Sequence, residues 1–157
     1  MKENVLEWMK LKHLSRQGWI RHGISHPESV ASHSWSMGVL AITLCPEHLD
    51  IEKIMKMCLL HDLAEVVIGD ITPEEHIPNK QELEHQAFQK IAHMHLAYFE
   101  EYEAGQTEEA QFVKCMDKLD MALQSLVYEH EFGLSLEQFR ESASIVLKGT
   151  PFEALYQ

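Results

Sequence analysis

Apolar side chains recur along this chain at the three- and four-residue intervals of amphipathic helices, and no convincing alternating run indicates a strand. A first helix is expected from about Asn4 to Leu14, followed by a loop from Ser15 to Pro27. A second helix should begin near Pro27, which suits a helix's first turn, and stop at Cys45-Pro46. The pattern predicts an all-α fold.

Caps and glycines mark the later boundaries. Asp50 is a good N-cap for a third helix from Ile51 to about Val67, which should end near Gly69. A turn with Asp70, Thr72 and Pro73 and a polar loop to Asn79 should follow. Two further helices are expected, from Lys80 to Tyr102 before Gly105 and from Glu108 to Glu131 with Thr107 as its cap. A capping box at Ser135-Leu136-Glu137-Gln138 should open a terminal helix, which ends before Gly149 and Pro151. With no repeat or linker, residues 1–157 are expected to form a single domain of about six helices.

Charge narrows the choice of partners. The chain has 25 acidic and 13 basic side chains, and its formal net charge is -12 with His neutral. This field repels nucleic-acid backbones and anionic membranes, so we expect neither polymeric nucleic acid nor a membrane as partner. The first residues lack the features of a secretory signal, and Cys45, Cys58 and Cys115 form no C-x-x-C pair. A cytoplasmic protein is therefore expected.

Candidate chemistry begins with His61-Asp62, which lies within the apolar run C-L-L-H-D-L-A-E-V-V-I-G-D. Burying such polar groups without partners costs several kcal/mol, so something must satisfy them. Glu65 lies four residues after His61 and projects toward the same helix surface. Asp70 follows directly after the predicted helix end.

Two further polar residues interrupt apolar helices in the same way, namely His33 in V-A-S-H-S-W-S-M-G-V and Asp117 in F-V-K-C-M-D-K-L-D. Taken singly, each could be a satisfied polar residue in a helical bundle. Together, His33, His61, Asp62 and Asp117 can surround a divalent ion and leave positions for water and phosphate oxygens. Mn, Fe, Co, Ni and Zn all accept such a donor set.

The order His33, His61-Asp62, Asp117 resembles the H…HD…D signature of HD-domain phosphohydrolases. Three runs are more specific, because they are similar to those of YfbR-type 5'-deoxynucleotidases and the HD-domain-containing protein 2 group. They are H-D-x-x-E-x-x-x-G-D from His61 to Asp70, R-x-G-W from Arg16 to Trp19, and P-E-S-V-A-S-H from Pro27 to His33. No G-Y-P element follows, so the cyclic-dinucleotide phosphodiesterase branch does not fit.

The resemblance implies a compact HD-domain bundle around a central metal, a homodimer, and hydrolysis of deoxyribonucleoside 5'-monophosphates to deoxynucleoside and phosphate. Glu65 would orient the attacking water or handle its proton, and Asp70 would support it, with a second ion near both as one option. Arg16 is the candidate phosphate clamp in catalysis. Trp19 would pack against sugar or base, and Lys118 is a further candidate for phosphate contact.

Alternatives remain open. The chain could hydrolyse another nucleotide, such as a triphosphate or a signalling nucleotide, or be a catalytically idle metal-binding or nucleotide-binding module. Glu65 and Asp70 could be a solvated helix end, Arg16 a surface charge and Trp19 a core residue. The acidic loop after Asp70 offers no cation for a phosphate dianion. His22, before Pro27, could approach the site.

Overall fold

The computed structural model describes residues 2–72 and 74–157, so the expectation for Pro73 lies outside the described residues. Within those ranges the chain forms helices and one isolated bridge between Ser15 and Ser29, which confirms the all-α prediction. The elements are α1 (Lys2–Trp8), η1 (Met9–His13), α2 (Gln17–Arg21), α3 (Val30–Leu44), α4 (Ile51–Leu60), α5 (Glu65–Ile68), α6 (Lys80–Ala92), η2 (His93–His95), α7 (Leu96–Ala104), α8 (Glu108–Phe132), α9 (Glu137–Leu147) and η3 (Glu153–Leu155).

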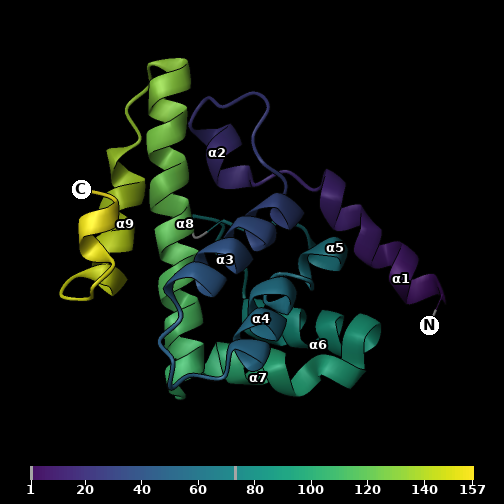
Figure 1. Ribbon diagram of the computed structural model, residues 1–157. Coiled ribbons are helices and arrows are strands. Elements are labelled where there is room, and N and C mark those ends of the chain that lie inside the picture. Colours follow the sequence, from purple (N-terminus) through teal and green to yellow (C-terminus); the bar gives the residue numbers. More distant parts are fainter. Residues whose placement is uncertain (1, 73) are drawn as a thin grey trace.

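The long helix α8 organises the bundle (Figure 1). As predicted, it starts at Thr107, whose side chain accepts a hydrogen bond from the Ala110 backbone N–H, and it ends before Gly133, which takes a positive φ of 67°. Figure 1 shows α9 along one side of α8 and α3 on the other. Fully buried side chains of α8, including Met116 and Leu119, form the main core with residues of α3 and α4.

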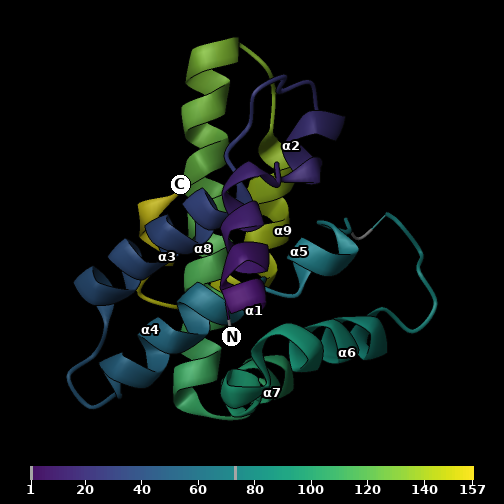
Figure 2. The ribbon, with the colours of Figure 1, turned by 90° about the vertical axis from the view of Figure 1, so that its right-hand side faces the viewer.

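A second apolar cluster joins the N-terminal segment to α5, α6 and α7, which lie together in Figure 2. Phe88 of α6 stacks on Phe99 of α7 with ring centroids 4.5 Å apart. Among the described residues, no helix has both the length and the apolarity needed to cross a membrane.

The predicted loop before the second long helix is wrong in part, because it contains the helix α2. Five residues make too short a helix to persist alone, so packing must hold it in place. Its Trp19 is 2% exposed and packs against Tyr128 and Phe139. The helix α3 starts at Val30 instead of near Pro27, because Ser29 supplies the N-cap by accepting from the Ser32 N–H.

The predicted third helix is interrupted. Regular α4 ends at Leu60, and the backbone then tightens to three-residue hydrogen bonds, including Leu63 N–H to Leu60 O and Glu65 N–H to Asp62 O. The tighter turn separates α4 from α5, and it carries His61 and Asp62.

Three other boundaries differ from expectation. The first helix becomes a 3-10 helix at Met9, and the helix predicted from Lys80 to Tyr102 is divided after Ala92. The Ser135 capping box is also wrong: Leu136 occupies the N-cap of α9, and its backbone N–H donates to Glu129 of α8 at 2.6 Å. A tertiary contact has replaced the local cap.

Candidate active site

Three elements bring the four predicted ligands together. His33 projects from α3, His61 and Asp62 from the turn after α4, and Asp117 from α8. Donor atoms of His33, His61 and Asp62 lie within 4.8 Å of one another. The Asp62 carboxylate is 3.0 Å from His61 Nε2, and Asp117 Oδ1 is 3.2 Å from His33 Nε2. Nitrogen and oxygen donors therefore face a common point.

Both imidazoles present Nε2 to that point. The Nδ1 of His61 is 3.0 Å from the Cys58 carbonyl oxygen, which can only accept a hydrogen bond. The Nδ1 of His33 is 2.7 Å from an Asp120 carboxylate oxygen. Each Nε2 is buried and has no hydrogen-bond partner among the described residues. Two such unpaired nitrogens are costly in a core, and a divalent ion would satisfy both.

Electrostatic interactions keep the carboxylates of Asp62 and Asp117 ionised. Burial would raise the pKa of Asp62, but His61, Arg16 and His33 together lower it. The pKa of Asp117 is likewise held low by Lys118 and His33 against the effect of burial. Both carboxylates are therefore ionised at neutral pH and attract a cation. Burial and Arg16 lower the pKa of His33, but the neighbouring carboxylates of Asp117 and Asp120 outweigh them and raise it to about 9.

Arg16 stands directly before α2, with Nη1 3.2 Å from an Asp62 oxygen. Burial alone would lower the pKa of Arg16, but the carboxylates of Asp62, Asp117, Asp70 and Glu65 raise it. A permanent positive charge is thus held against an otherwise acidic site.

Glu65 and Asp70 lie at the two ends of α5. Glu65 Oε2 is buried and has no partner among the described residues. Burial, with the nearby charges of Asp62 and Asp70, raises the pKa of Glu65 to about 10. One Asp70 oxygen accepts the Gln17 backbone N–H at 2.6 Å, so this carboxylate anchors the first turn of α2.

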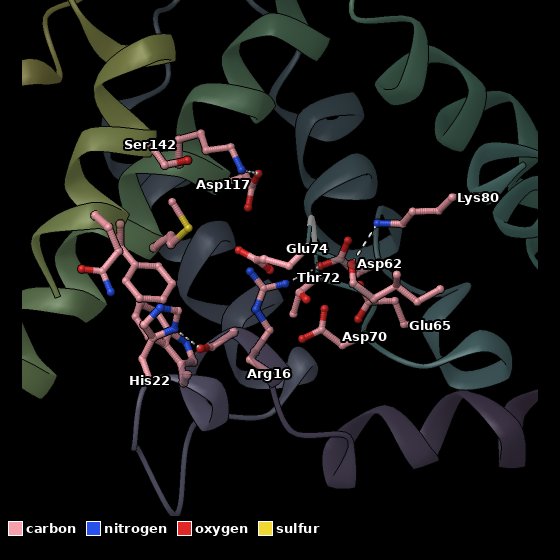
Figure 3. A pocket seen from close by; sticks show the side chains of 17 residues that line it. Arg16, His22, Asp62, Glu65, Asp70, Thr72, Glu74, Lys80, Asp117 and Ser142 are labelled. Carbon is pink, nitrogen blue, oxygen red and sulfur yellow. Dashed lines mark hydrogen bonds and ion pairs between the residues drawn. The ribbon is translucent and has the colours of Figure 1, made fainter. Parts of the chain in front are cut away.

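A cavity of about 380 Å³ opens beside the cluster (Figure 3). His33 and His61 are not part of its wall, since they lie among the buried residues. Figure 3 shows Arg16 in the middle of the group, with His22 on one side and Asp62 and Asp70 on the other. The remaining predicted site residues all line it: Arg16, Trp19, Asp62, Glu65, Asp70, Asp117 and Lys118.

The HD domain family model matches residues 8–155 of this sequence. The chain belongs to the HD-domain family. The four residues of the predicted H…HD…D signature are those that the fold brings together beside the cavity, with Asp62 and Asp117 on its wall.

Relatives of this HD-domain protein support the same family. The 5'-deoxynucleotidase hdd1 of Schizosaccharomyces pombe is 35% identical over 153 residues, which cover 87% of this chain and 77% of that protein. The crystal structure of PH0347 protein from Pyrococcus horikoshii has a TM-score of 0.89 at 33% identity, covering 98% and 92% of the two chains. A predicted metal-dependent phosphohydrolase from Magnetospirillum magnetotacticum has a TM-score of 0.76 at 26% identity, covering 99% and 88%.

Trp19 of the HD-domain protein forms part of the cavity wall, yet it is 2% exposed. Its ring centroid lies 4.2 Å from that of Phe139, and its Nε1–H donates to a Glu28 oxygen at 3.0 Å. Most of the indole is therefore core, and its contact with a sugar or base stays a prediction. Lys118 Nζ lies 3.2 Å from an Asp117 oxygen, which leaves the ammonium at the cavity edge.

Sequence reasoning missed several residues of this HD-domain site. The wall from α9 has no motif, because glutamine, phenylalanine and serine are ordinary residues of an amphipathic helix. Lys80, which donates to the Ile71 carbonyl at 3.0 Å, supplies a cation beyond the acidic loop. Asp120 could have been suspected, because it lies three residues after Asp117 on one helix. His22, which the sequence placed within possible reach of the site, also lines the wall, and the missed wall residues include Lys80, Met121, Gln138, Phe139 and Ser142.

Proposed function

We propose that this protein is a metal-dependent 5'-deoxynucleotidase, which hydrolyses deoxyribonucleoside 5'-monophosphates to deoxynucleoside and phosphate. The observation that carries the proposal is the pair of buried Nε2 atoms of His33 and His61, which have no hydrogen-bond partner among the described residues. They lie next to Asp62, behind a cavity whose wall includes the cations Arg16, Lys80 and Lys118. The relative named 5'-deoxynucleotidase hdd1, at 35% identity, supports the substrate class.

In this proposal His33, His61, Asp62 and Asp117 hold one divalent ion, and Mn, Fe, Co, Ni and Zn all suit the donors. A bound ion of this kind lowers the pKa of a water and offsets negative charge on phosphate oxygens. The two imidazoles are held by their Nδ1 atoms, so they need no reorientation to bind it.

Arg16 and Lys118 bind the phosphate. The guanidinium has five N–H donors, of which the Asp62 contact engages Nη1, so donors remain for two phosphate oxygens. Lys118 supplies a second positive charge from α8. These local cations oppose the repulsion that a net charge of -12 exerts on an anionic substrate.

Glu65 orients the attacking water or takes its proton. Its carboxylate lines the cavity, and one buried oxygen has no partner among the described residues. A carboxylate whose pKa burial has raised binds a proton more strongly than an exposed one, which suits a general base once ionised. Asp70 supports the site by anchoring α2, and with Glu65 it offers the oxygens for a second ion.

The nucleoside lies toward the less charged part of the wall. Phe139 of α9 and His22 after α2 meet there edge to face, with ring centroids 5.0 Å apart, and can pack against a base. Close packing of the sugar against the segment from Arg16 to Trp19 leaves little room for a 2'-hydroxyl, which favours deoxyribose.

The test is phosphate release from deoxy and ribo 5'-monophosphates, diphosphates and triphosphates, with several metals restored after chelator stripping. We expect the deoxy 5'-monophosphates to be hydrolysed with the highest kcat/KM. Preferred release from a triphosphate or a signalling nucleotide would favour the alternative phosphohydrolase. Metal and nucleotide binding without any turnover would identify a catalytically idle module.

We also infer a single domain over residues 1–157, a homodimer and a cytoplasmic location, all from the sequence and its family resemblance. Light scattering on the purified protein tests the dimer directly. A monomer mass at working concentration would contradict it and leave the nucleotidase proposal intact.

A further inference from the structure

A second carboxylate lies on the side of His33 away from the cavity. Asp120 follows Asp117 by one turn of α8, and its oxygen is 2.7 Å from His33 Nδ1. His33 is 0% exposed and Asp120 is 6% exposed, so almost no water competes for this contact. The proposed function gives Asp120 no role.

The contact decides where the imidazole proton can lie. A neutral histidine carries one proton, and only the nitrogen without it can bind a metal. A carboxylate accepts but does not donate, so Asp120 holds the proton on Nδ1. In the neutral ring, the form that binds a metal, the lone pair is then on Nε2, which lies 3.2 Å from Asp117 and 4.0 Å from Asp62.

His61 is also held by a hydrogen bond at Nδ1, but its partner is a weaker acceptor. Its Nδ1 is bound to the neutral Cys58 carbonyl, whereas that of His33 is bound to a carboxylate. A carboxylate partner raises the basicity of a coordinating imidazole as well as fixing its orientation. His33 should therefore be the more strongly binding of the two.

Glu28, which lies next to His33 and Asp120, is itself held in place by hydrogen bonds. Donor atoms of Glu28, His33 and Asp120 lie within 4.8 Å of one another. Glu28 accepts from Trp19 Nε1 at 3.0 Å, and its backbone N–H donates to the Tyr128 hydroxyl at 2.7 Å. These contacts restrict the movement of the side chains next to the His33–Asp120 bond.

We propose that Asp120 is a positioning residue that acts through His33, fixing the tautomer and direction of this ring so that Nε2 is delivered to the metal. The proposal rests on the proposed function only in requiring a metal at His33. A purely structural role for the same bond predicts lost stability in an Asp120 variant with unchanged metal affinity.

The experiment replaces Asp120 with Asn, whose amide can donate to Nδ1 and so move the imidazole proton to Nε2. Glu129→Gln is the matched control, because it makes the same chemical change on the same helix at a residue paired with Arg140 at 2.8 Å, outside the cavity. Affinity is measured for Co²⁺ and Zn²⁺ by chelator competition on stripped full-length protein. We expect about 10–100-fold weaker binding for Asp120→Asn and no more than about a twofold change for Glu129→Gln.

Equal affinity of wild type and Asp120→Asn would overturn the positioning role while leaving the metal site and the nucleotidase proposal standing. A wild type that binds neither ion tightly would instead contradict the proposed function as well. Nitrogen-15 NMR of the zinc-loaded wild type supplies a measurement independent of any variant. The His33 proton is expected on Nδ1, and a proton on Nε2 would rule the proposal out.

Discussion

His33 and His61 are buried, and within the part of the chain that the structure describes their Nε2 atoms have no hydrogen bond, although each ring is held at Nδ1. A protein that needed these rings only for packing could use apolar residues at lower cost, since a buried polar atom without a partner is unfavourable. With two ionised carboxylates beside them, the nitrogens instead suit a dication. We therefore expect this arrangement to lower the stability of the metal-free fold and to favour metal binding.

We expect about one tightly held transition metal per chain in the purified protein. Asp62→Ala and His33→Ala should each lose most of it, because each removes a donor from the shared site. Elemental analysis measures the content, with His85→Ala as the control, since that exposed ring pairs with Glu100 on the surface. Retention of wild-type metal content in both site variants would refute the proposed coordination.

Glu65→Gln should lower kcat and kcat/KM together by at least about a hundredfold, because a group that handles the attacking water acts mainly in the transition state. Metal content should remain. Steady-state kinetics and elemental analysis check the two expectations. Unchanged activity would move the role elsewhere, with Asp70 as the next candidate, and lost metal would make Glu65 a ligand.

The same substitution should stabilise the metal-free protein. Glu65 has a folded pKa of about 10, above its unfolded value, so the folded state binds a proton that the unfolded state releases between about pH 4.5 and 10. Stability therefore falls as pH rises through that window. Glutamine carries no charge and avoids this loss, so the Tm at pH 8 should rise relative to wild type in chelator. A lower Tm for Glu65→Gln would show that the carboxyl makes a stabilising contact.

Among the helices, α2 shows how a short element can carry specific chemistry. Its five residues cannot hold a helix alone, yet Asp70 accepts its first N–H and Trp19 is packed between aromatic rings. Arg16, at its N-cap, is thereby aimed at Asp62. The position of Arg16, the proposed phosphate-binding residue, therefore depends on the packing of Trp19.

Trp19→Ala should reduce the preference for deoxyribose over ribose, because it opens the cavity wall at the sugar. The ratio of kcat/KM for a deoxy and a ribo 5'-monophosphate with the same base measures this, and it should fall more than metal content does. Trp19→Phe keeps an aromatic ring and serves as the comparison. Equal kcat/KM for both sugars in the wild type would contradict the proposed deoxyribose preference and leave the nucleotidase proposal unaffected.

For the protein as a whole, the site ties together segments far apart in the chain. The proposed ligands come from α3, the turn after α4 and α8, and each of these segments also contributes to one of the two apolar clusters. An ion bound by all three stabilises the folded state alone, because the unfolded chain cannot bring the donors together.

Metal removal should therefore lower the thermal stability. Free metal at 100 times its Kd contributes about 2.7 kcal/mol, which corresponds to a Tm change of roughly 5–10 °C for a domain of this size. Calorimetry with and without chelator measures it, and Asp62→Ala should show almost no response to added metal. An unchanged Tm of the wild type when metal is added would contradict metal binding to the folded state.

Much of this molecule could be predicted from the amino-acid sequence, because local rules govern it. Helical periodicity predicted the all-α fold, and Thr107 and Asp50 were identified as caps from their positions alone. Polar residues inside apolar helices indicated that His33, His61, Asp62 and Asp117 belong together, and the fold brings them together. That they bind a metal stays a prediction. The three-residue spacing of Asp117 and Asp120 can be read from the sequence, but it does not show that Asp120 contacts His33.

Tertiary structure decided what depends on contacts between distant residues. The hydrogen bond between His33 and Asp120 joins positions 87 residues apart, and no local sequence pattern predicts it. The helix α2 exists because Trp19 is packed against α8 and α9, and the α9 wall of the cavity is made of residue types common on any helix. Side-chain chemistry is encoded locally, but which side chains share a site follows only from how the helices pack.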